Sequence, residues 1–263
     1  MVGGSASFQD YLSKIGIGAK RTAQYISVNS YSELSKELQD AGCMVFRLGA
    51  PSGSKHTHFA LASTVTGWSD YFLMDRELFS SSEPEVFLPN VSVRSLFAFQ
   101  LLPKLTETSL VNLSLASGVL PHALNCGDKG HQLIPATGQS VFTFEFRPHS
   151  SSAISLLHSS GQVEIDAIFV GQRGGKECLF IIEAKSGRFD SISKHKLVYP
   201  LLAIKEKVPA YMEIIPVYVR AIRRDGCIEF NIAECSLKVE DGQIPAMDQL
   251  VVNKVSRYSL WGY

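Results

Sequence analysis

Residues 161–187 read GQVEIDAIFVGQRGGKECLFIIEAKSG, and their spacing predicts a β-hairpin. Alternate side chains of a strand point to opposite faces, so Glu164 and Asp166 share one face and the apolar residues around them share the other. The glycines at 171, 174 and 175 predict a turn between the two strands. The second strand begins with four apolar residues, 179–182, which is typical of a strand buried on both faces.

Charged side chains end the second strand. Glu183 and Lys185 follow the apolar run on one face, and Ala184 points away. Charged groups beside buried surface need partners, because an unpaired buried charge is strongly destabilising. We expect a divalent metal ion to be the partner of Glu183 and Asp166. The alternative is a plain ion pair between Glu183 and Lys185 at a strand end, which is common and stabilises little.

The composition is that of a soluble globular protein. The chain has 263 residues, of which 45% are hydrophobic and 19% are charged. This length allows one large domain or two small ones. It contains no run of the ~20 apolar residues that a membrane span requires. The N-terminus also lacks the apolar core of a signal peptide.

The cysteines and histidines do not predict a zinc site. The five cysteines form no C-x-x-C pair, and the seven histidines show no H-E-x-x-H spacing. An odd number of scattered cysteines favours small buried thiols in a reducing cytoplasm. We therefore expect a cytoplasmic protein without structural zinc.

Positive and negative residues are equal in number, but they are unevenly distributed along the chain. The net charge of zero argues mildly against nucleic-acid binding, since most strong DNA binders have a basic surface. After the hairpin, however, basic residues outnumber acidic ones, which predicts a basic rim beside it or an ordinary solvated face. These residues are Lys185, Arg188, Lys194, Lys196, Lys205, Lys207, Arg220, Arg223 and Arg224.

Two regions are predicted, residues 1–90 and 91–263, divided near the polar stretch at 80–85. The first region alternates α and β elements. Ser30 and Glu33 predict a capping box for a helix over 30–38. Strands are expected at 43–48, 58–63 and 71–74, with a polar loop over 51–58.

The second region predicts the order helix, three strands, helix, strand. Helical pieces are expected over 105–124, broken near Gly118 and Pro121, and a helix over 191–207 that kinks or restarts at Pro200. Pro216 predicts a bulge or an edge position for its strand. The strands are expected at 141–147, 163–170, 178–185, 214–219 and 228–233. This order indicates a mixed α/β or α+β sheet with a helix on at least one face.

Asp166 and Glu183-Ala184-Lys185, placed across a hairpin within this order, resemble the PD-(D/E)xK nuclease superfamily, which includes many type II restriction endonucleases. The resemblance covers about residues 105–233 and implies a restriction-endonuclease-like α-β-β-β-α-β core. The proline that usually precedes the aspartate is replaced by Ile165. A helical Gln-x-x-x-Tyr of some members has a partial echo in His195 and Tyr199, although Tyr199 also suits the core.

The resemblance implies roles for four residues. Asp166, Glu183 and the Ala184 carbonyl would bind Mg²⁺, for which Mn²⁺ could substitute, because these cations take oxygen ligands. Lys185 would position the attacking water and contact the scissile phosphate.

Further residues have alternative interpretations. Glu164 is either an accessory base or ligand or an exposed strand residue, and Glu145 on the preceding strand is a more distant candidate. Lys194, Lys196 and Arg188 are either DNA-phosphate contacts or surface cations.

The expected activity is that of a Mg²⁺-dependent, sequence-specific endonuclease for double-stranded DNA, of the type II restriction class. Arg47 and the loop over 51–58 in the N-terminal region are candidate contacts to base edges. A homodimer is expected, since a palindromic site matches two-fold protein symmetry. The alternatives are a repair or junction-resolving nuclease with the same core, and a non-catalytic nucleic-acid-binding domain.

Overall fold

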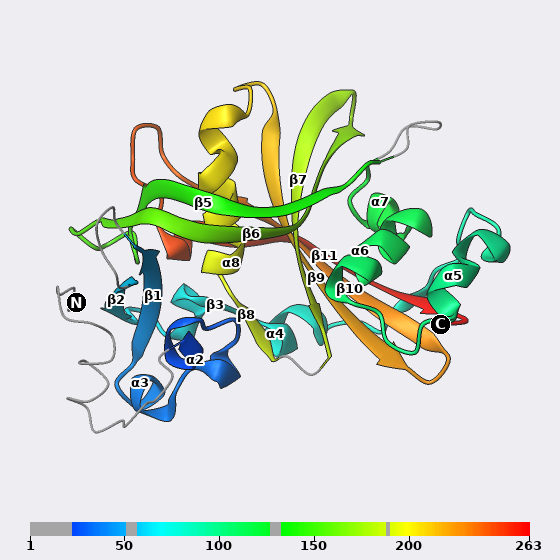
Figure 1. The fold of residues 1–263 in the computed structure, drawn as a ribbon, viewed down its shortest axis with the longest axis horizontal. Coiled ribbons are helices and arrows are strands. Elements are labelled where there is room, and N and C mark those ends of the chain that lie inside the picture. Colours follow the sequence, from blue (N-terminus) through cyan, green and yellow to red (C-terminus); the bar gives the residue numbers. More distant parts are fainter. Residues whose placement is uncertain (1–22, 51–56, 127–132, 188–189) are drawn as a thin grey trace.

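The computed structural model describes residues 23–50, 57–126, 133–187 and 190–263. Within these ranges, nine strands form one mixed sheet, and two short strands pair separately. The sheet runs in the order β2 (His58–Ser63), β1 (Cys43–Gly49), β6 (Leu156–Arg173), β7 (Lys176–Ser186), β9 (Glu213–Arg224), β10 (Cys227–Leu237), β11 (Leu250–Trp261) and β4 (Glu85–Val86), with β5 (Ala136–Phe146) also paired to β6. The fold is therefore mixed α+β, with strands on both sides of residue 90 in the same sheet (Figure 1).

The predicted order of helix, three strands, helix, strand is present. It comprises α6 (Glu107–Ala116), β5, β6, β7, α8 (His195–Ile204) and β9, with short elements between them. β5, β6 and β7 are antiparallel neighbours, whereas β9 runs parallel to β7. A parallel pair needs a crossover connection, and α8 supplies it.

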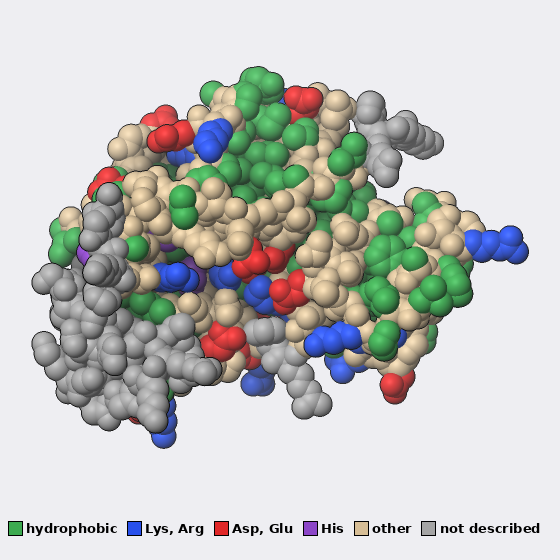
Figure 2. Space-filling model, in the orientation of Figure 1, with side chains coloured by type: hydrophobic (Ala, Val, Ile, Leu, Met, Phe, Trp, Pro, Cys, Tyr) green, Lys and Arg blue, Asp and Glu red, His purple; other side chains and the backbone are tan. Residues whose placement is uncertain are grey.

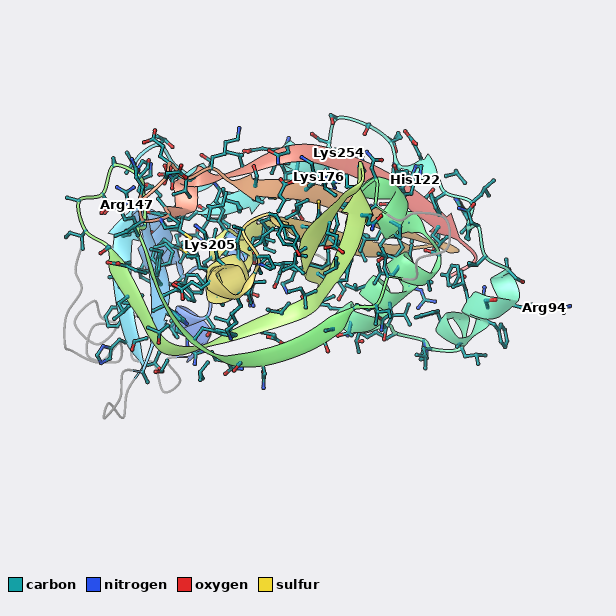
Figure 3. All side chains as sticks on the ribbon, turned by 90° about the horizontal axis from the view of Figure 1, so that it is seen from above. Arg94, His122, Arg147, Lys176, Lys205 and Lys254 are labelled. Carbon is teal, nitrogen blue, oxygen red and sulfur yellow. The ribbon has the colours of Figure 1, made fainter. Side chains whose placement is uncertain are left out.

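Helices cover both faces of the sheet. The strands curl around α8, which ends near Lys205, while α6 and α7 (Val119–Ala123) lie on the other side (Figure 3). The two faces hold separate hydrophobic cores: Ile181 belongs to the core with α8, and Phe180 and Ile182 belong to the core with α6 and α7. These three side chains are at most 1% exposed, which confirms that β7 is buried on both faces.

The hairpin between β6 and β7 turns on two residues. Gly174 and Gly175 have φ of +57° and +77°, the left-handed values that a tight two-residue hairpin turn requires and that glycine adopts at low cost. Gly171, predicted for the turn, instead lies in β6 against Phe180. Arg173, directly before the turn, forms an ion pair of 2.7 Å with Glu234 of β10.

The helix predicted over 30–38 begins later in the chain than expected. Residues Tyr31–Glu33 form a single 3₁₀ turn, and α3 spans only Lys36–Asp40. The Ser35 side chain caps α3 by accepting from the Leu38 amide, while the Ser30 side chain makes no capping bond. Glu33 accepts from the Asn29 amide at 2.8 Å, so the polar pattern serves a turn before the helix.

The predicted helix over 191–207 begins later, at His195. Residues Ser191–Ser193 form β8, which pairs with β3 (Phe72–Met74). A partner more than a hundred residues away in the chain therefore overrides the local helical pattern. Pro200 lies inside α8.

Pro216 was predicted at a bulge or an edge, but β9 is a central strand between β7 and β10. Pairing of β9 with β10 starts only at Val217. Pro216 therefore lies where β9 has a neighbour on the β7 side alone, and its missing N–H is tolerated there.

The remaining predictions fared unevenly. The break between α6 and α7 falls at Gly118, whereas Pro121 lies in the first turn of α7, where a missing N–H costs no hydrogen bond. All five cysteines are free, and four are buried. Within the described ranges, no helix has both the length and the apolar character needed to cross a membrane. The other short elements are α2 (Ala23–Ile26), η2 (Trp68–Asp70), α4 (Asp75–Phe79), η3 (Val93–Leu96), α5 (Phe97–Gln100), η4 (Lys205–Lys207) and η5 (Met247–Gln249).

Candidate active site

Asp166 lies at the point where β6 and β7 separate. The backbone pairing of the hairpin ends at Ala167 and Ile182, and Asp166 is the next residue of β6 beyond this pair. Beyond this pair, the Ala184 amide of β7 donates to Oδ2 of Asp166 at 2.8 Å instead of to a backbone carbonyl. The side chain of Asp166 thereby continues the ladder by one bond, which holds its carboxylate beside the end of β7.

Glu183 and Lys185 project together from β7 and are buried, at 3% and 8% exposure. The Nζ of Lys185 lies 2.8 Å from Oε1 of Glu183 and donates to the Ala184 carbonyl oxygen at 2.9 Å. The predicted grouping of Asp166, Glu183, Ala184 and Lys185 is thus present as a set of contacts. Figure 2 shows acidic and basic side chains lying side by side near the middle of this face.

Glu107 joins this group from α6. Thr106 caps the helix by accepting from the Ser109 amide at 3.1 Å, which places Glu107 in the first turn. Its Oε1 accepts from the Ser186 amide at 3.2 Å, and its Oε2 lies 3.5 Å from Nζ of Lys185. Glu107 was not predicted from the sequence. Its only local signal is an acidic residue directly after a threonine cap, and tertiary packing alone brings it to β7.

Lys196 adds a second cation from the first turn of α8. Its Nζ lies 3.6 Å from Oε1 of Glu183, and its side chain is 24% exposed. When all five groups are ionised, three carboxylates face two ammonium groups, which leaves one negative charge over. Cations are therefore attracted to the group consisting of Glu107, Asp166, Glu183, Lys185 and Lys196, hereafter the β7 cluster.

Burial and charge act in opposite directions on the ionisation of this cluster. Burial raises the pKa of Glu183, although Lys196 and Lys185 pull it down. For Lys185, burial lowers the pKa, but the carboxylates of Glu183 and Glu107 outweigh burial and raise it above its ordinary value. Lys185 is therefore a firmly protonated ammonium group.

The other predicted site residues lie around the cluster. Glu164 is exposed on β6 and lines a cavity of about 110 Å³ together with Arg47, His195 and Lys196. Glu145 hydrogen-bonds Ser155 at the surface. Among the described residues, neither carboxylate hydrogen-bonds to any of the four predicted residues, so Glu164 is an accessory candidate by position alone. 

Lys194 is a correction to the predicted basic face. It is only 6% exposed, and burial lowers its pKa. Its position directly after β8, which pairs with β3, explains this burial, so Lys194 is poorly placed to reach a phosphate. Arg188 and the loop residues 51–56 lie outside the described residues.

His195 and Tyr199 belong to an aromatic cluster rather than to the charged group. The ring of Tyr199 packs against Phe144, Phe146 and His158, and its hydroxyl donates to the Arg47 carbonyl at 3.4 Å. Burial, and then the charge of Lys196, lowers the pKa of His195 to about 3. A neutral His195 and a core Tyr199 give no direct support to a catalytic role for this pair.

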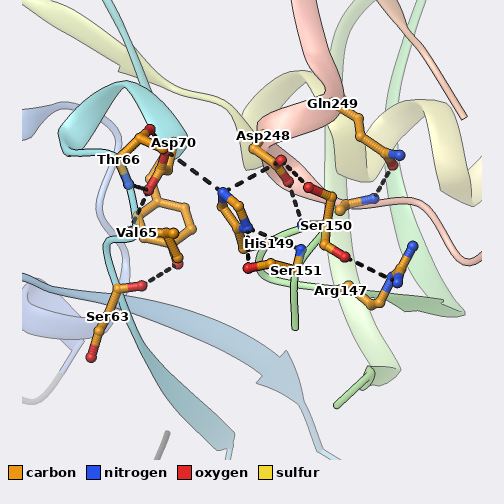
Figure 4. Close-up of polar contacts among 12 residues, drawn as sticks. Ser63, Val65, Thr66, Asp70, Arg147, His149, Ser150, Ser151, Asp248 and Gln249 are labelled. Atoms are coloured by element: carbon orange, nitrogen blue, oxygen red, sulfur yellow. Dashed lines mark hydrogen bonds and ion pairs between the residues drawn. The ribbon is translucent and has the colours of Figure 1, made fainter. Parts of the chain in front are cut away.

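A second polar cluster, formed by Asp70, His149 and Asp248, was not predicted (Figure 4). The Nε2 of His149 lies 3.5 Å from Oδ2 of Asp248 and 3.9 Å from Oδ1 of Asp70. Backbone amides of Val65 and Thr66 donate to Asp70 at 2.6 and 3.0 Å. The Ser150 amide donates to Asp248 at 2.7 Å. This group, hereafter the His149 cluster, ties together η2, the β5–β6 connection and η5.

Neither cluster contains an evident cage of protein ligands for a metal. Among the described residues, no three His, Cys, Asp or Glu side chains are arranged to hold a metal ion. An ion at the β7 cluster would therefore depend on fewer side chains together with backbone oxygen and water. Such partial ligation is ordinary for Mg²⁺, which keeps several waters in proteins.

Comparison with known proteins identifies a family. The family model described as "Domain of unknown function (DUF6997)" matches residues 76–241. This span is more than half of the chain and includes every member of the β7 cluster, so the chain belongs to this family. No curated protein and no solved structure matches the chain.

Proposed function

We propose that this member of the DUF6997 family is a Mg²⁺-dependent endonuclease that hydrolyses the phosphodiester bonds of double-stranded DNA. The observation that carries the proposal is the position of the Lys185 ammonium group. It lies 2.8 Å from Glu183 Oε1 and 2.9 Å from the Ala184 oxygen, beside an Asp166 carboxylate that is bonded to the Ala184 amide. Oxygen ligands next to a cation suit metal-assisted phosphodiester hydrolysis.

The oxygens at the end of β7 fit a magnesium ion. Asp166, Glu183 and the Ala184 carbonyl would hold it, and all three offer the oxygen ligands that Mg²⁺ and Mn²⁺ accept. The Oε1 of Glu183 is buried and receives no well-aligned hydrogen bond from the described residues, although two ammonium groups approach it. A bound ion would supply a water of lowered pKa and would offset negative charge on the phosphate.

Lys185 has the main role among the side chains. Its firmly protonated ammonium group would hold the attacking water and donate a hydrogen bond to a non-bridging phosphate oxygen. Glu107 would position Lys185, because its carboxylate is tied to the Ser186 amide and lies beside the ammonium group. Glu164 is an accessory candidate on the open side of β6.

The chain order of α6, β5, β6, β7, α8 and β9 supports the proposal, because it is the order expected of a restriction-endonuclease-like core. We also propose that the protein cuts DNA at a defined sequence and that it acts as a homodimer. A repair or junction-resolving nuclease would use the same chemistry on a different substrate. A non-catalytic binding domain is less well supported, because it would have no physical need to bury Glu183 beside two lysines.

Incubation of the purified protein with phage DNA tests the proposal. We expect discrete fragments with Mg²⁺ or Mn²⁺ and none with a chelator. Asp166→Asn should abolish cutting, because the amide oxygen can still accept from Ala184 while the metal-binding charge is lost. Calorimetry should also show weaker Mn²⁺ binding in this variant, which is a readout independent of activity.

Glu177→Gln is the matched control, since Glu177 is an exposed carboxylate on the same hairpin. It should cut DNA and bind Mn²⁺ as the unmodified protein does. A smear in place of discrete fragments would indicate a non-specific nuclease. Cutting that resists the chelator would refute the metal mechanism, and no cutting under any condition would refute the nuclease.

A further inference from the structure

A basic cavity of about 620 Å³ adjoins the β7 cluster. It is bounded by the loop before α6, the end of β7, and the neighbouring ends of β9 and β10. Among the described residues, its lining includes four cations, Lys104, Arg220, Arg223 and Arg224, and no acidic side chain. The cavity therefore has the electrostatic character of an anion-binding site.

The four cations are not equally available. Arg220 forms an ion pair of 2.7 Å with the buried Asp75, so its charge is already matched. Arg224 lies 3.3 Å from Glu229 but is 60% exposed. Lys104 and Arg223 are exposed. Lys104 and Arg223 are thus the strongest candidates for contact with a ligand, and Arg224 is the next.

The mouth of the cavity is held in shape by a bond between two segments. A guanidinium nitrogen of Arg223 donates to the Pro103 carbonyl at 2.7 Å, which joins the end of β9 to the loop before α6. Lys104 follows Pro103 directly, so this bond keeps the two cations close together in the lining of one cavity. Preorganised cations lose less conformational entropy when they bind an anion.

The cavity leads to the β7 cluster through Ser186. Ser186 lines the cavity, and its amide donates to Glu107, whose other oxygen lies 3.5 Å from Nζ of Lys185. The cavity thus begins one residue beyond Lys185. An anionic polymer that presents one phosphate to Lys185 would bring a neighbouring phosphate to this cavity.

Apolar side chains form much of the remaining lining and limit the kind of anion. Leu105, Leu110, Ile222 and Ile228 lie beside the cations. A sugar or a base can pack against such a surface while its phosphate contacts the cations. The cavity therefore suits a nucleotide unit of a polymer better than a bare inorganic anion.

We infer that this cavity binds the sugar–phosphate backbone of the strand that is cut, at the phosphates next to the scissile one, through Lys104 and Arg223. The inference rests on the proposed function for the place of the scissile phosphate, but not for the binding itself. It assigns to the end of β9 and to the loop before α6 the task of holding the substrate across the end of β7.

Duplex binding at a series of salt concentrations tests this inference. The protein carries Asp166→Asn and Ca²⁺ is present, so that binding is measured without cutting. Each phosphate contact contributes about 0.9 to the slope of log affinity against log salt. We expect Lys104→Gln and Arg223→Gln each to reduce the slope by about that amount, so the affinity lost between about 50 and about 200 mM salt shrinks roughly threefold per contact.

Lys36→Gln is the control, because Lys36 is an exposed lysine of α3, away from the cavity. Slopes equal to that of Lys36→Gln would overturn the inference, as would the absence of duplex binding in the parent protein. Arg224→Gln, which leaves the Arg223–Pro103 bond intact, should show a smaller change in the same direction. The side chain of Lys104 is exposed, so Lys104→Gln should not disturb the fold. The salt slope of this variant therefore tests the inference even if Arg223→Gln loosens the contact between β9 and the loop before α6.

Further outcomes distinguish free phosphate from DNA phosphate as the ligand. They also distinguish a failure of the cavity assignment from a failure of the proposed hydrolysis. If inorganic phosphate binds with a Lys104-dependent heat as large as that of the duplex, the ligand is free phosphate and the inference is wrong. If Lys104→Gln lowers the salt slope but the unmodified protein never cuts DNA, the binding cavity stands and the proposed hydrolysis fails. If cutting occurs with an unchanged slope, the hydrolysis stands and the cavity assignment fails.

Discussion

The β7 cluster and the His149 cluster both bury carboxylates, but they provide for these carboxylates in different ways. Asp70 and Asp248 accept from backbone amides of Val65, Thr66 and Ser150. Glu183 instead relies on the ammonium groups of Lys185 and Lys196. Backbone amides and hydroxyl groups donate to Asp70 and Asp248, whereas two lysine ammonium groups neutralise Glu183.

Under the proposed function, this difference separates a structural cluster from a reactive one. A carboxylate held by backbone amides has its hydrogen bonds wherever the fold is intact, which stabilises the fold. A buried carboxylate balanced by lysines can exchange one cation for another, because an ammonium group on a flexible side chain can move. Under the proposed function, the β7 cluster would accept a metal ion, while the His149 cluster links three segments of the chain.

The largest expected effect is the loss of cleavage in Lys185→Met. Methionine keeps most of the volume but removes the ammonium group, and the loss of such a group costs about 10²–10⁴-fold in rate. Cleavage rates with saturating Mg²⁺, and duplex binding in Ca²⁺, provide the measurements. Binding should persist. Lys176→Met, on the exposed start of β7, is the matched control and should cut normally; an equal loss in both variants would remove Lys185 from the mechanism.

The second prediction concerns the His149 cluster. Asp248→Ala removes the acceptor for the Ser150 amide and hydroxyl, and buried donors without partners cost about 1–3 kcal/mol of stability. The urea midpoint of unfolding should fall by a corresponding amount, while the cleavage rate of the folded protein stays unchanged. Asp241→Ala, at an exposed loop position, should leave the midpoint in place. A large loss of cleavage in folded Asp248→Ala would make the His149 cluster functional.

Glu107→Gln should have a smaller effect on the β7 cluster. The amide can still accept from Ser186, but the charge beside Lys185 is lost. The carboxylates raise the pKa of Lys185, so the loss of one lowers this pKa and should move the alkaline limb of the pH–rate profile to lower pH. We expect at most about a tenfold loss of rate near neutrality, equivalent to ~1.4 kcal/mol. An unchanged alkaline limb would contradict the positioning role.

The smallest effect is a pH dependence of stability from Asp70. Burial raises the pKa of Asp70, but hydrogen bonds from Thr66 and Val65 and the charge of His149 outweigh it, so the pKa is lowered. A lowered pKa contributes stability above the unfolded pKa of about 3.9, and this contribution is lost as the pH falls through the folded value. Thermal unfolding of Asp70→Asn should therefore show a shallower decline in acid than the unmodified protein. Parallel declines would exclude this contribution.

Local patterns predicted much of the hairpin. The period of two placed Asp166, Glu183 and Lys185 on the correct strands and made Ala184 point away, because alternation is a property of any extended backbone. The two glycines of the turn were also predictable, since few other residues adopt positive φ. These features need no knowledge of distant parts of the chain.

Contacts between distant segments escaped the same reasoning. Glu107 reaches Ser186 across 79 positions of sequence, and Arg173 reaches Glu234 across 61. Lys194 is buried because the three residues before it form β8, which pairs with β3, and do not form the first turn of a helix. In each case the local pattern was compatible with an exposed side chain, and the partner came from another element of the fold.

The amino-acid order alone thus specified the alternating strands and the chemical groups at their ends, because side-chain direction in a strand follows from backbone geometry. The packing of α6, α8 and the N-terminal strands on the sheet decided which charged side chains contact one another. It also decided which of them line a cavity. Packing fixes distances between residues far apart in the chain, and electrostatic interactions depend on those distances. The motif could therefore be predicted from residues 161–187, whereas Glu107, the contact of Lys196 with Glu183 and the gathering of basic residues around one cavity required the tertiary structure.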